Sequence, residues 1–227
     1  MLILAIETST GAGSIALLED DRLVSSVRLD PQRRTAQSLA PTLASQLRAA
    51  GWLPQQVNLV AVSQGPGSFT GLRVGVTTAK AFAYGVGAEV LGVNTLEAIA
   101  AQTSLDCPFL WAVVDAQRGQ VFTALFRQSQ GGDPGIIEPT TILDAEAWLS
   151  RLTAGVGVTG PGLVRLADRL PPGVRVADRP LWTPQAATVG QLAALRHRRG
   201  ERADLWALAP HYYRPSAADE KLQARKH

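Results

Sequence analysis

One order of elements occurs twice along this chain of 227 residues. The first copy has apolar, strand-like runs at 2–6, 12–19 and 21–29, a helix near 38–50, a strand at 57–63, the turn Gly65-Pro66-Gly67 and a helix near 68–85. The second has strands near 109–115, 120–127 and 136–142, a helix near 144–153, a strand at 155–159, the turn Gly160-Pro161-Gly162 and a helix near 163–170. Because both turns occur within matching element orders, duplication explains them better than coincidence.

The sequence therefore predicts an α/β protein of two similar lobes, with further strands at 88–93 and 174–176 and a last helix near 185–199. We expect an N-terminal lobe at 1–104 and a C-terminal lobe at 105–212. The last helix could pack back on the first lobe. Residues 213–227 are polar and are expected to form a flexible tail.

The composition fits a globular protein of the cytoplasm, with 46% hydrophobic and 18% charged residues. No apolar run approaches the roughly 20 residues that span a bilayer, and the N-terminus lacks a basic segment before a short apolar run. The single cysteine, Cys107, excludes an internal disulfide and fits a reducing compartment. We expect a cytoplasmic protein with no membrane association.

The turn Gly65-Pro66-Gly67 lies between a strand and a helix, in the segment GPGSFTGLR at 65–73. A glycine-rich turn at a helix N-terminus can bind phosphate through backbone N–H groups and the helix dipole. The segment lacks the Gly-Lys-Ser/Thr ending of a Walker A loop, so a purely structural turn is the alternative. We expect Ser68 to cap the helix that follows.

Three segments resemble the bacterial TsaB (YeaZ) family: LILAIETST at 2–10, GPGSFTGLR at 65–73 and GVNTLEA at 92–98. The resemblance is strong over the first hundred residues and loose in the second half. It implies the two-lobed actin/hexokinase/Hsp70-like (ASKHA) superfold. It also implies a non-catalytic subunit required for threonylcarbamoylation (t6A) of adenosine 37 in tRNA.

The resemblance implies an inherited cleft that has lost its catalytic residues. Active members of the superfold use an Asp at the end of the first strand, and a partner in the second lobe, to position Mg²⁺ and nucleotide. Here Glu7 and Asp115 take those places, and Thr8 follows Glu7 where a glycine is usual. We expect Glu7, Thr8 and Asp115 to line a vestigial cleft. A weak nucleotide contact, or an acid–base pair of the two carboxylates, stays open.

Metal chemistry is expected to be absent. The catalytic relatives, the TsaD/Kae1 subunits, carry a His-x-x-x-His pair that places two imidazoles on one helix face. Aligned on Gly92 and Val93, the two positions are Thr95 and Ile99 in this chain. No catalytic residue, cofactor or metal ligand is therefore predicted. The alternative is a self-sufficient ATPase, phosphotransferase or metallohydrolase of the same fold.

Small residues recur every four positions along the helix near 68–85, as Gly71, Gly75, Ala79 and Ala83. Glycine inside a helix costs about 1 kcal/mol relative to alanine, so close approach by another helix is the expected gain. The helix near 38–50 offers Leu39, Leu43 and Leu47 on one stripe and Ala36, Ala40 and Ala44 on another. The helices could pair within one lobe or across an interface.

The family resemblance favours an interface, whose candidate residues are Leu39, Leu43, Leu47, Gly71, Arg73, Gly75 and Ala79. On this interpretation, Gly75→Leu or Leu43→Glu disrupts association and leaves each protomer folded. Arg73 is expected to contact a carboxylate, a phosphate or a backbone carbonyl across the lobe boundary.

The partners implied by the resemblance are a TsaD-type catalytic subunit and a TsaE-type ATPase subunit, with a homodimer when the chain is alone. The chain has a net charge of +3, with basic residues gathered at 196–202 and in the tail. These residues form either a solvated surface or a weak RNA contact. We expect tRNA to bind only within the complex.

Overall fold

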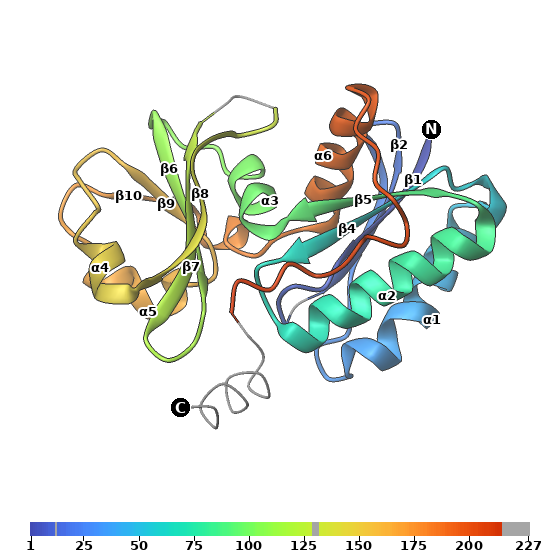
Figure 1. The fold of residues 1–227 in the computed structure, drawn as a ribbon, viewed down its shortest axis with the longest axis horizontal. Coiled ribbons are helices and arrows are strands. Elements are labelled where there is room, and N and C mark those ends of the chain that lie inside the picture. The colour runs from blue at the N-terminus through green and yellow to red at the C-terminus, as the bar shows by residue number, and fades with distance from the viewer. Residues whose placement is uncertain (12, 129–131, 215–227) are drawn as a thin grey trace.

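The computed structural model describes residues 1–11, 13–128 and 132–214, which form two five-stranded sheets side by side (Figure 1). The first half contains β1 (Leu2–Glu7), β2 (Ser14–Glu19), β3 (Arg22–Arg28), α1 (Thr35–Ala49), β4 (Leu59–Gly65), α2 (Phe69–Val86), β5 (Glu89–Asn94) and α3 (Thr95–Ala101). The second contains β6 (Phe109–Asp115), β7 (Gln120–Arg127), β8 (Gly135–Asp144), α4 (Ala145–Leu149), β9 (Gly157–Thr159), α5 (Leu163–Leu166), β10 (Arg175–Val176) and α6 (Ala186–Arg198).

Both sheets have the same topology. The first has the strand order β3-β2-β1-β4-β5, and the second has β8-β7-β6-β9-β10. In each, the first three strands pair antiparallel and the last two join in parallel. This identity of order and direction confirms the predicted α/β fold built from two copies of one unit.

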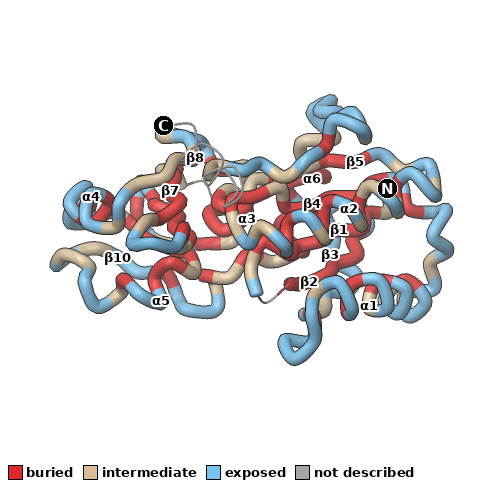
Figure 2. The backbone as a smooth tube through the Cα atoms, turned by 60° about the horizontal axis from the view of Figure 1, so that its bottom comes forward, coloured by how far each residue is buried: buried red, intermediate tan, exposed pale blue. Residues whose placement is uncertain are grey.

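The central strands are buried on both faces, which explains their nearly continuous apolar sequences. In β1, Ile3, Leu4, Ala5 and Ile6 have no exposed surface. The edge strand β3 alternates partly buried and exposed residues in its second half instead. Figure 2 shows this arrangement as buried central strands surrounded by exposed outer segments.

Helices cover both faces of each sheet. On one face of the first sheet, α1 and α2 lie side by side and share a core with β1, β2 and β4. The equivalent face of the second sheet packs against α4 and α5.

The remaining two helices lie across the lobes. Helix α6, which comes last in the chain, packs on the first sheet through Ala186, Val189 and Ala193. Helix α3, from the first half, places Leu96 and Ile99 in the core of the second sheet. Helix α6 lies very close to the first sheet at Gly190, where an added Cβ would lie 2.4 Å from Leu18 Cδ1 of β2.

Three local predictions need correction. Helix α1 begins at Thr35 and not near residue 38, so Pro41 lies in its second turn. Helix α3 was not expected as a separate helix, because five of its seven residues are buried and no polar face marks it. The tail expected at 213–227 begins too early, because Tyr213 and Arg214 make the defined contacts described below. Residues 215–227 lie outside the described part of the chain.

Candidate functional site

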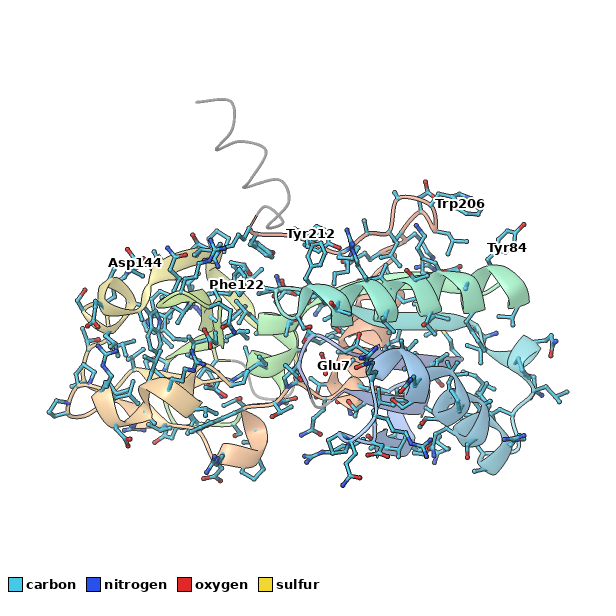
Figure 3. All side chains as sticks on the ribbon, turned by 90° about the horizontal axis from the view of Figure 1, so that it is seen from below. Glu7, Tyr84, Phe122, Asp144, Trp206 and Tyr212 are labelled. Carbon is cyan, nitrogen blue, oxygen red and sulfur yellow. The ribbon has the colours of Figure 1, made fainter. Side chains whose placement is uncertain are left out.

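A cavity of about 790 Å³ lies between the two lobes. Its walls come from five places in the chain: the loop after β1, the first glycine-rich turn with the start of α2, the β6–β7 hairpin, Pro161 of the second glycine-rich turn and residues 211–214. Aromatic and cationic side chains share this lining, namely Phe69, Arg73, Phe122, Tyr212, Tyr213 and Arg214. Figure 3 shows Tyr212 beside the first turn of α2 and Phe122 in the second lobe.

The Gly65-Pro66-Gly67 turn is filled by the chain itself. A Cβ added at Gly67 would lie 2.3 Å from the carbonyl oxygen of Ser9, and the Ser68 N–H donates to that oxygen at 2.7 Å. The Ser9 carbonyl oxygen therefore accepts from the N–H group that a phosphate oxygen would need as its donor, and its partial negative charge would repel the anion. Of the two readings of this turn, the structure favours the structural one. Ser68 caps α2 as expected, because its Oγ accepts from the Gly71 N–H at 3.2 Å.

The second turn is also occupied. A Cβ added at Gly160 would lie 2.2 Å from the carbonyl oxygen of Val113, which accepts a hydrogen bond from Gly162 N–H at 3.0 Å. Both glycine-rich turns therefore allow close approach by backbone of the same lobe, from the loop after β1 at the first turn and from β6 at the second.

The glycines of α2 accommodate the loop after β1. A Cβ at Gly71 would lie 2.1 Å from the carbonyl oxygen of Thr8, and one at Gly75 would lie 2.1 Å from Thr8 Oγ1. The same hydroxyl donates to the carbonyl of Gly71 at 2.8 Å. The contact with Thr8 therefore explains the two glycines, whereas their spacing predicts a helix–helix contact. A Gly75→Leu protein would lose this contact within the protomer.

Glu7 lies beneath the loop, with no exposed surface, and does not line the cavity. Its Oε1 accepts from Ser9 N–H at 2.6 Å, from Ser9 Oγ and from Ser63 Oγ at 3.3 Å, while Oε2 has no hydrogen-bond partner. Burial raises the pKa of the Glu7 carboxyl to about 7, and the bonds from Ser9 and Ser63 oppose part of that rise. Glu7 is a half-satisfied loop anchor, inaccessible to a ligand in the cavity.

Asp115 does line the cavity, but it has its own partners. One carboxylate oxygen accepts from Gln117 N–H at 2.7 Å, and the other lies 3.2 Å from Arg165 Nη1. The residues described by the structure include no group of three or more His, Cys, Asp or Glu side chains placed to hold a metal. At the two positions that align with the histidine pair of the TsaD/Kae1 subunits, Thr95 is fully buried and Ile99 packs in the core of the second sheet.

Among the described residues, Arg73 is bonded to neither a carboxylate nor a backbone carbonyl. Its Nε donates to the hydroxyl of Tyr212 at 3.0 Å, and its guanidinium lies 4.1 Å from the centre of the Phe69 ring. The Tyr212 and Phe69 rings are 4.6 Å apart. Arg73 is thus held by an aromatic pair at the mouth of the cavity.

The remaining candidate interface residues lie inside the protomer. Leu39, Leu43 and Leu47 are at most 6% exposed and pack against β1, β2 and β4, and Ala79 has no exposed surface. A Leu43→Glu substitution would therefore place a charge in the core of the first lobe. Sequence periodicity found the stripe and left both arrangements open, and of these the burial of the three leucines supports packing within one lobe.

The outer surface of the two helices is formed by other residues. We define the α1–α2 face as their exposed residues, among them Ala36, Ala40, Ala44, Arg48, Arg73, Thr77 and Tyr84. At one end of it, Tyr84 and Trp206 are 69% and 70% exposed, with ring centroids 5.5 Å apart. Figure 3 shows this pair at the far end of α2 from Tyr212.

The basic cluster at 196–202 is extensively paired. Arg196 lies between Glu97 and Asp133, and the other members contact Asp21, Glu89 or Asp133. Paired charges favour the solvated-surface interpretation over an RNA contact in this part of the chain. Lys221, Arg225 and Lys226 lie outside the described residues.

The segment after α6 was not expected to build the site. We call residues 199–214 the C-terminal strap, because they run from the end of α6 along the first lobe to the cavity (Figure 1). The only sequence signal was the aromatic run Tyr212-Tyr213 followed by Arg214. Such a short run does not specify which lobe it contacts.

Within the described ranges, the structure has no helix long and apolar enough to cross a membrane.

Comparisons with known proteins agree with this architecture. Residues 30–144, about half the chain, match the TsaD family model, described as tRNA N6-adenosine threonylcarbamoyltransferase. The tRNA threonylcarbamoyladenosine biosynthesis protein TsaB of Escherichia coli is 27% identical over 100% of both chains. Its Bacillus subtilis counterpart is 32% identical over 67% of this chain and 66% of its own length.

Solved structures show the same fold. YeaZ from Pseudomonas aeruginosa superposes with a TM-score of 0.80 at 27% identity, covering 93% of this chain and 99% of that one. An activator of 2-hydroxyisocaproyl-CoA dehydratase from Clostridium difficile, solved with bound ADPNP, reaches 0.51 at 9% identity, covering 90% of this chain and 99% of that chain. The second likeness concerns the fold alone.

Proposed function

This chain belongs to the TsaD family as one of its TsaB (YeaZ) proteins, and we propose that it serves threonylcarbamoyladenosine formation in tRNA as a non-catalytic subunit. In this role it binds and activates a TsaD-type catalytic subunit, and a TsaE-type ATPase joins the assembly. The tRNA, modified at adenosine 37, is bound by the complex and not by this chain alone. In isolation the chain forms a homodimer.

One observation carries the non-catalytic part of the proposal: the chain fills the turn at which a phosphate could otherwise bind. Ser9 occupies the first glycine-rich turn, and Glu7 is fully buried beneath it. Asp115 is already paired with Gln117 and Arg165. A self-sufficient phosphotransferase would need to bind a nucleotide with its metal at the end of β1. These residues leave few unpaired groups there for that purpose.

The α1–α2 face supports the binding part of the proposal. It presents the small side chains of Ala36, Ala40 and Ala44, which allow close approach by a partner helix, and ends at the exposed Tyr84–Trp206 pair. Large aromatic residues are frequent anchors of protein interfaces. The buried leucines of α1 support this face from beneath.

The experiment is co-purification with the cognate TsaD-type protein, using Ala40→Glu as the test variant. Ala40 is exposed, so the substitution leaves the fold intact but places a long charged side chain on the face. We expect it to weaken the complex by at least about tenfold, which corresponds to about 1.4 kcal/mol. The matched control is Ala147→Glu, an exposed alanine on α4 of the second lobe.

Two results would contradict the proposal. One is an Ala40→Glu protein that binds as well as the Ala147→Glu control, which would remove the α1–α2 face from the interface. The other is ATP hydrolysis by the purified chain that disappears in Glu7→Ala or Asp115→Ala, which would make the chain an enzyme in its own right.

A further inference from the structure

We propose that residues 211–214 of the C-terminal strap act as a built-in clamp, which spans the cleft and holds the two lobes at one angle without a nucleotide. In this protein a piece of the chain would do what a bound ligand does in two-lobed enzymes, which is to contact both lobes at once. Three sets of contacts support the proposal.

The first set fixes the strap to the first lobe before it reaches the cleft. Leu208 is buried in the core beneath α1 and α2, and Lys80 Nζ donates to the carbonyls of Trp206 and Leu208 at 3.0 and 2.9 Å. The backbone of Gln64 accepts from His211 N–H at 2.7 Å, and its side chain donates to Ala209 O at 3.1 Å. The strap therefore enters the cleft from a fixed position.

Two glycines of the sequence motifs make this attachment possible. A Cβ added at Gly65 would lie 2.8 Å from the carbonyl oxygen of His211, and one at Gly92 would lie 1.9 Å from the side chain of Gln64. Gly65 also has φ +116, a conformation that favours glycine. The first glycine-rich turn thus receives the strap on one side and Ser9 on the other.

The second set places two aromatic rings at the lobe boundary. Tyr212 packs on Phe69 and accepts from Arg73, both in the first lobe. Tyr213 accepts from Asn94 Nδ2 at 3.1 Å at the end of β5, and its ring lies 6.2 Å from that of Phe122 in the second lobe. Tyr213 is therefore in contact with both lobes.

The third set is made by Arg214 on the second lobe alone. Its Nη1 donates to the carbonyl of Ala116 at 2.6 Å, and its Nη2 donates to Gln120 Oε1. Both acceptors belong to the β6–β7 hairpin. Because the first set holds residues 208–211 on the first lobe, these two bonds tie the lobes together over a span of only three residues.

The test measures the distance between the lobes in the full chain. Spin labels at Ser45→Cys on α1 and Ala147→Cys on α4, both exposed, report it by pulsed electron paramagnetic resonance in a Cys107→Ser background. Four proteins are compared: the full chain, a chain ending at Pro210, a control ending at Pro215, and Arg214→Ala. The charge-matched control for the last is Arg127→Ala, an exposed arginine of β7.

We expect one narrow distance distribution in the full chain, unchanged by Mg²⁺ and ATP, and the same distribution in both controls. The chain ending at Pro210 and the Arg214→Ala protein should show a broader distribution shifted to longer distances. An unchanged distribution in Arg214→Ala, or a shift of the full chain on addition of ATP, would overturn the clamp. If the shorter chain does not fold, the Arg214→Ala comparison decides by itself.

Discussion

Gly75 and Gly85 lie in the same helix but have opposite surroundings. A Cβ at Gly75 would meet Thr8 Oγ1 at 2.1 Å, whereas one at Gly85 would meet nothing within 4 Å. We expect Gly75→Ala to lower the free energy of unfolding by about 1–3 kcal/mol, because the added methyl overpacks the loop contact. Gly85→Ala should raise it by up to about 1 kcal/mol through helix propensity. Urea denaturation of the two variants checks both signs, and equal changes would contradict the role assigned to Thr8.

Glu7 predicts a pH dependence of stability. Its pKa is raised from 4.5 to about 7 in the folded protein, so the folded state holds more protons than the unfolded state between these values. The free energy of unfolding therefore falls as the pH rises through this window, by about 3 kcal/mol in total, and stays low above it. Ionisation of a carboxyl with one unpartnered oxygen is the physical cause.

Replacing Glu7 by glutamine removes that ionisation while keeping an accepting oxygen. Glu7→Gln should be more stable than the parent at pH 8 and nearly equal to it at pH 5, by urea denaturation at the two pH values. Glu201→Gln, at an exposed position, controls for the loss of one negative charge. Equal behaviour of the two variants at pH 8 would show that the Glu7 carboxylate is better satisfied than its contacts indicate.

At the level of the elements, the sequence was most informative where burial is one-sided or continuous. The apolar runs of β1 and β4 and the two glycine-rich turns were enough to predict a duplicated α/β fold. Helix α3 was not predicted from the sequence, because Leu96 and Ile99 face one lobe while Ala98 faces the other. This arrangement leaves no polar stripe that would give the segment a helical period.

The candidate site was predicted less well, for a related reason. Spacing along α2 shows that Gly71 and Gly75 share a face, but it does not show what approaches that face. The answer comes from Thr8, more than sixty residues earlier in the chain. Tyr213 and Arg214 were missed likewise, because their partners lie in distant segments at Asn94, Ala116 and Gln120.

For the whole molecule, the distribution of charge predicts which partner the α1–α2 face prefers. Residues 31–88 contain no Asp or Glu, whereas Arg48 and Arg73 lie on the α1–α2 face. Two copies of this chain would bring like charges together across a symmetric interface. An acidic surface on a TsaD-type subunit would be attracted to the same face.

We therefore expect salt to act in opposite directions on the two complexes. Raising NaCl from about 50 to about 500 mM shortens the Debye length, so it should weaken the heterodimer and strengthen the homodimer. Sedimentation at several salt concentrations gives both dissociation constants. A heterodimer unaffected by salt would refute the electrostatic preference, while the absence of any heterodimer would refute the proposed function itself.

The positions of α3 and α6 have a consequence for how this chain can be divided. A cut after residue 104 would separate two halves of similar topology, yet the first would lose the helix that covers one face of its sheet, and the second would lose α3 from its core. Each fragment would expose an apolar sheet surface that only the other fragment can cover. The repeat in the sequence therefore marks two related halves, whereas the unit of folding comprises both of them together.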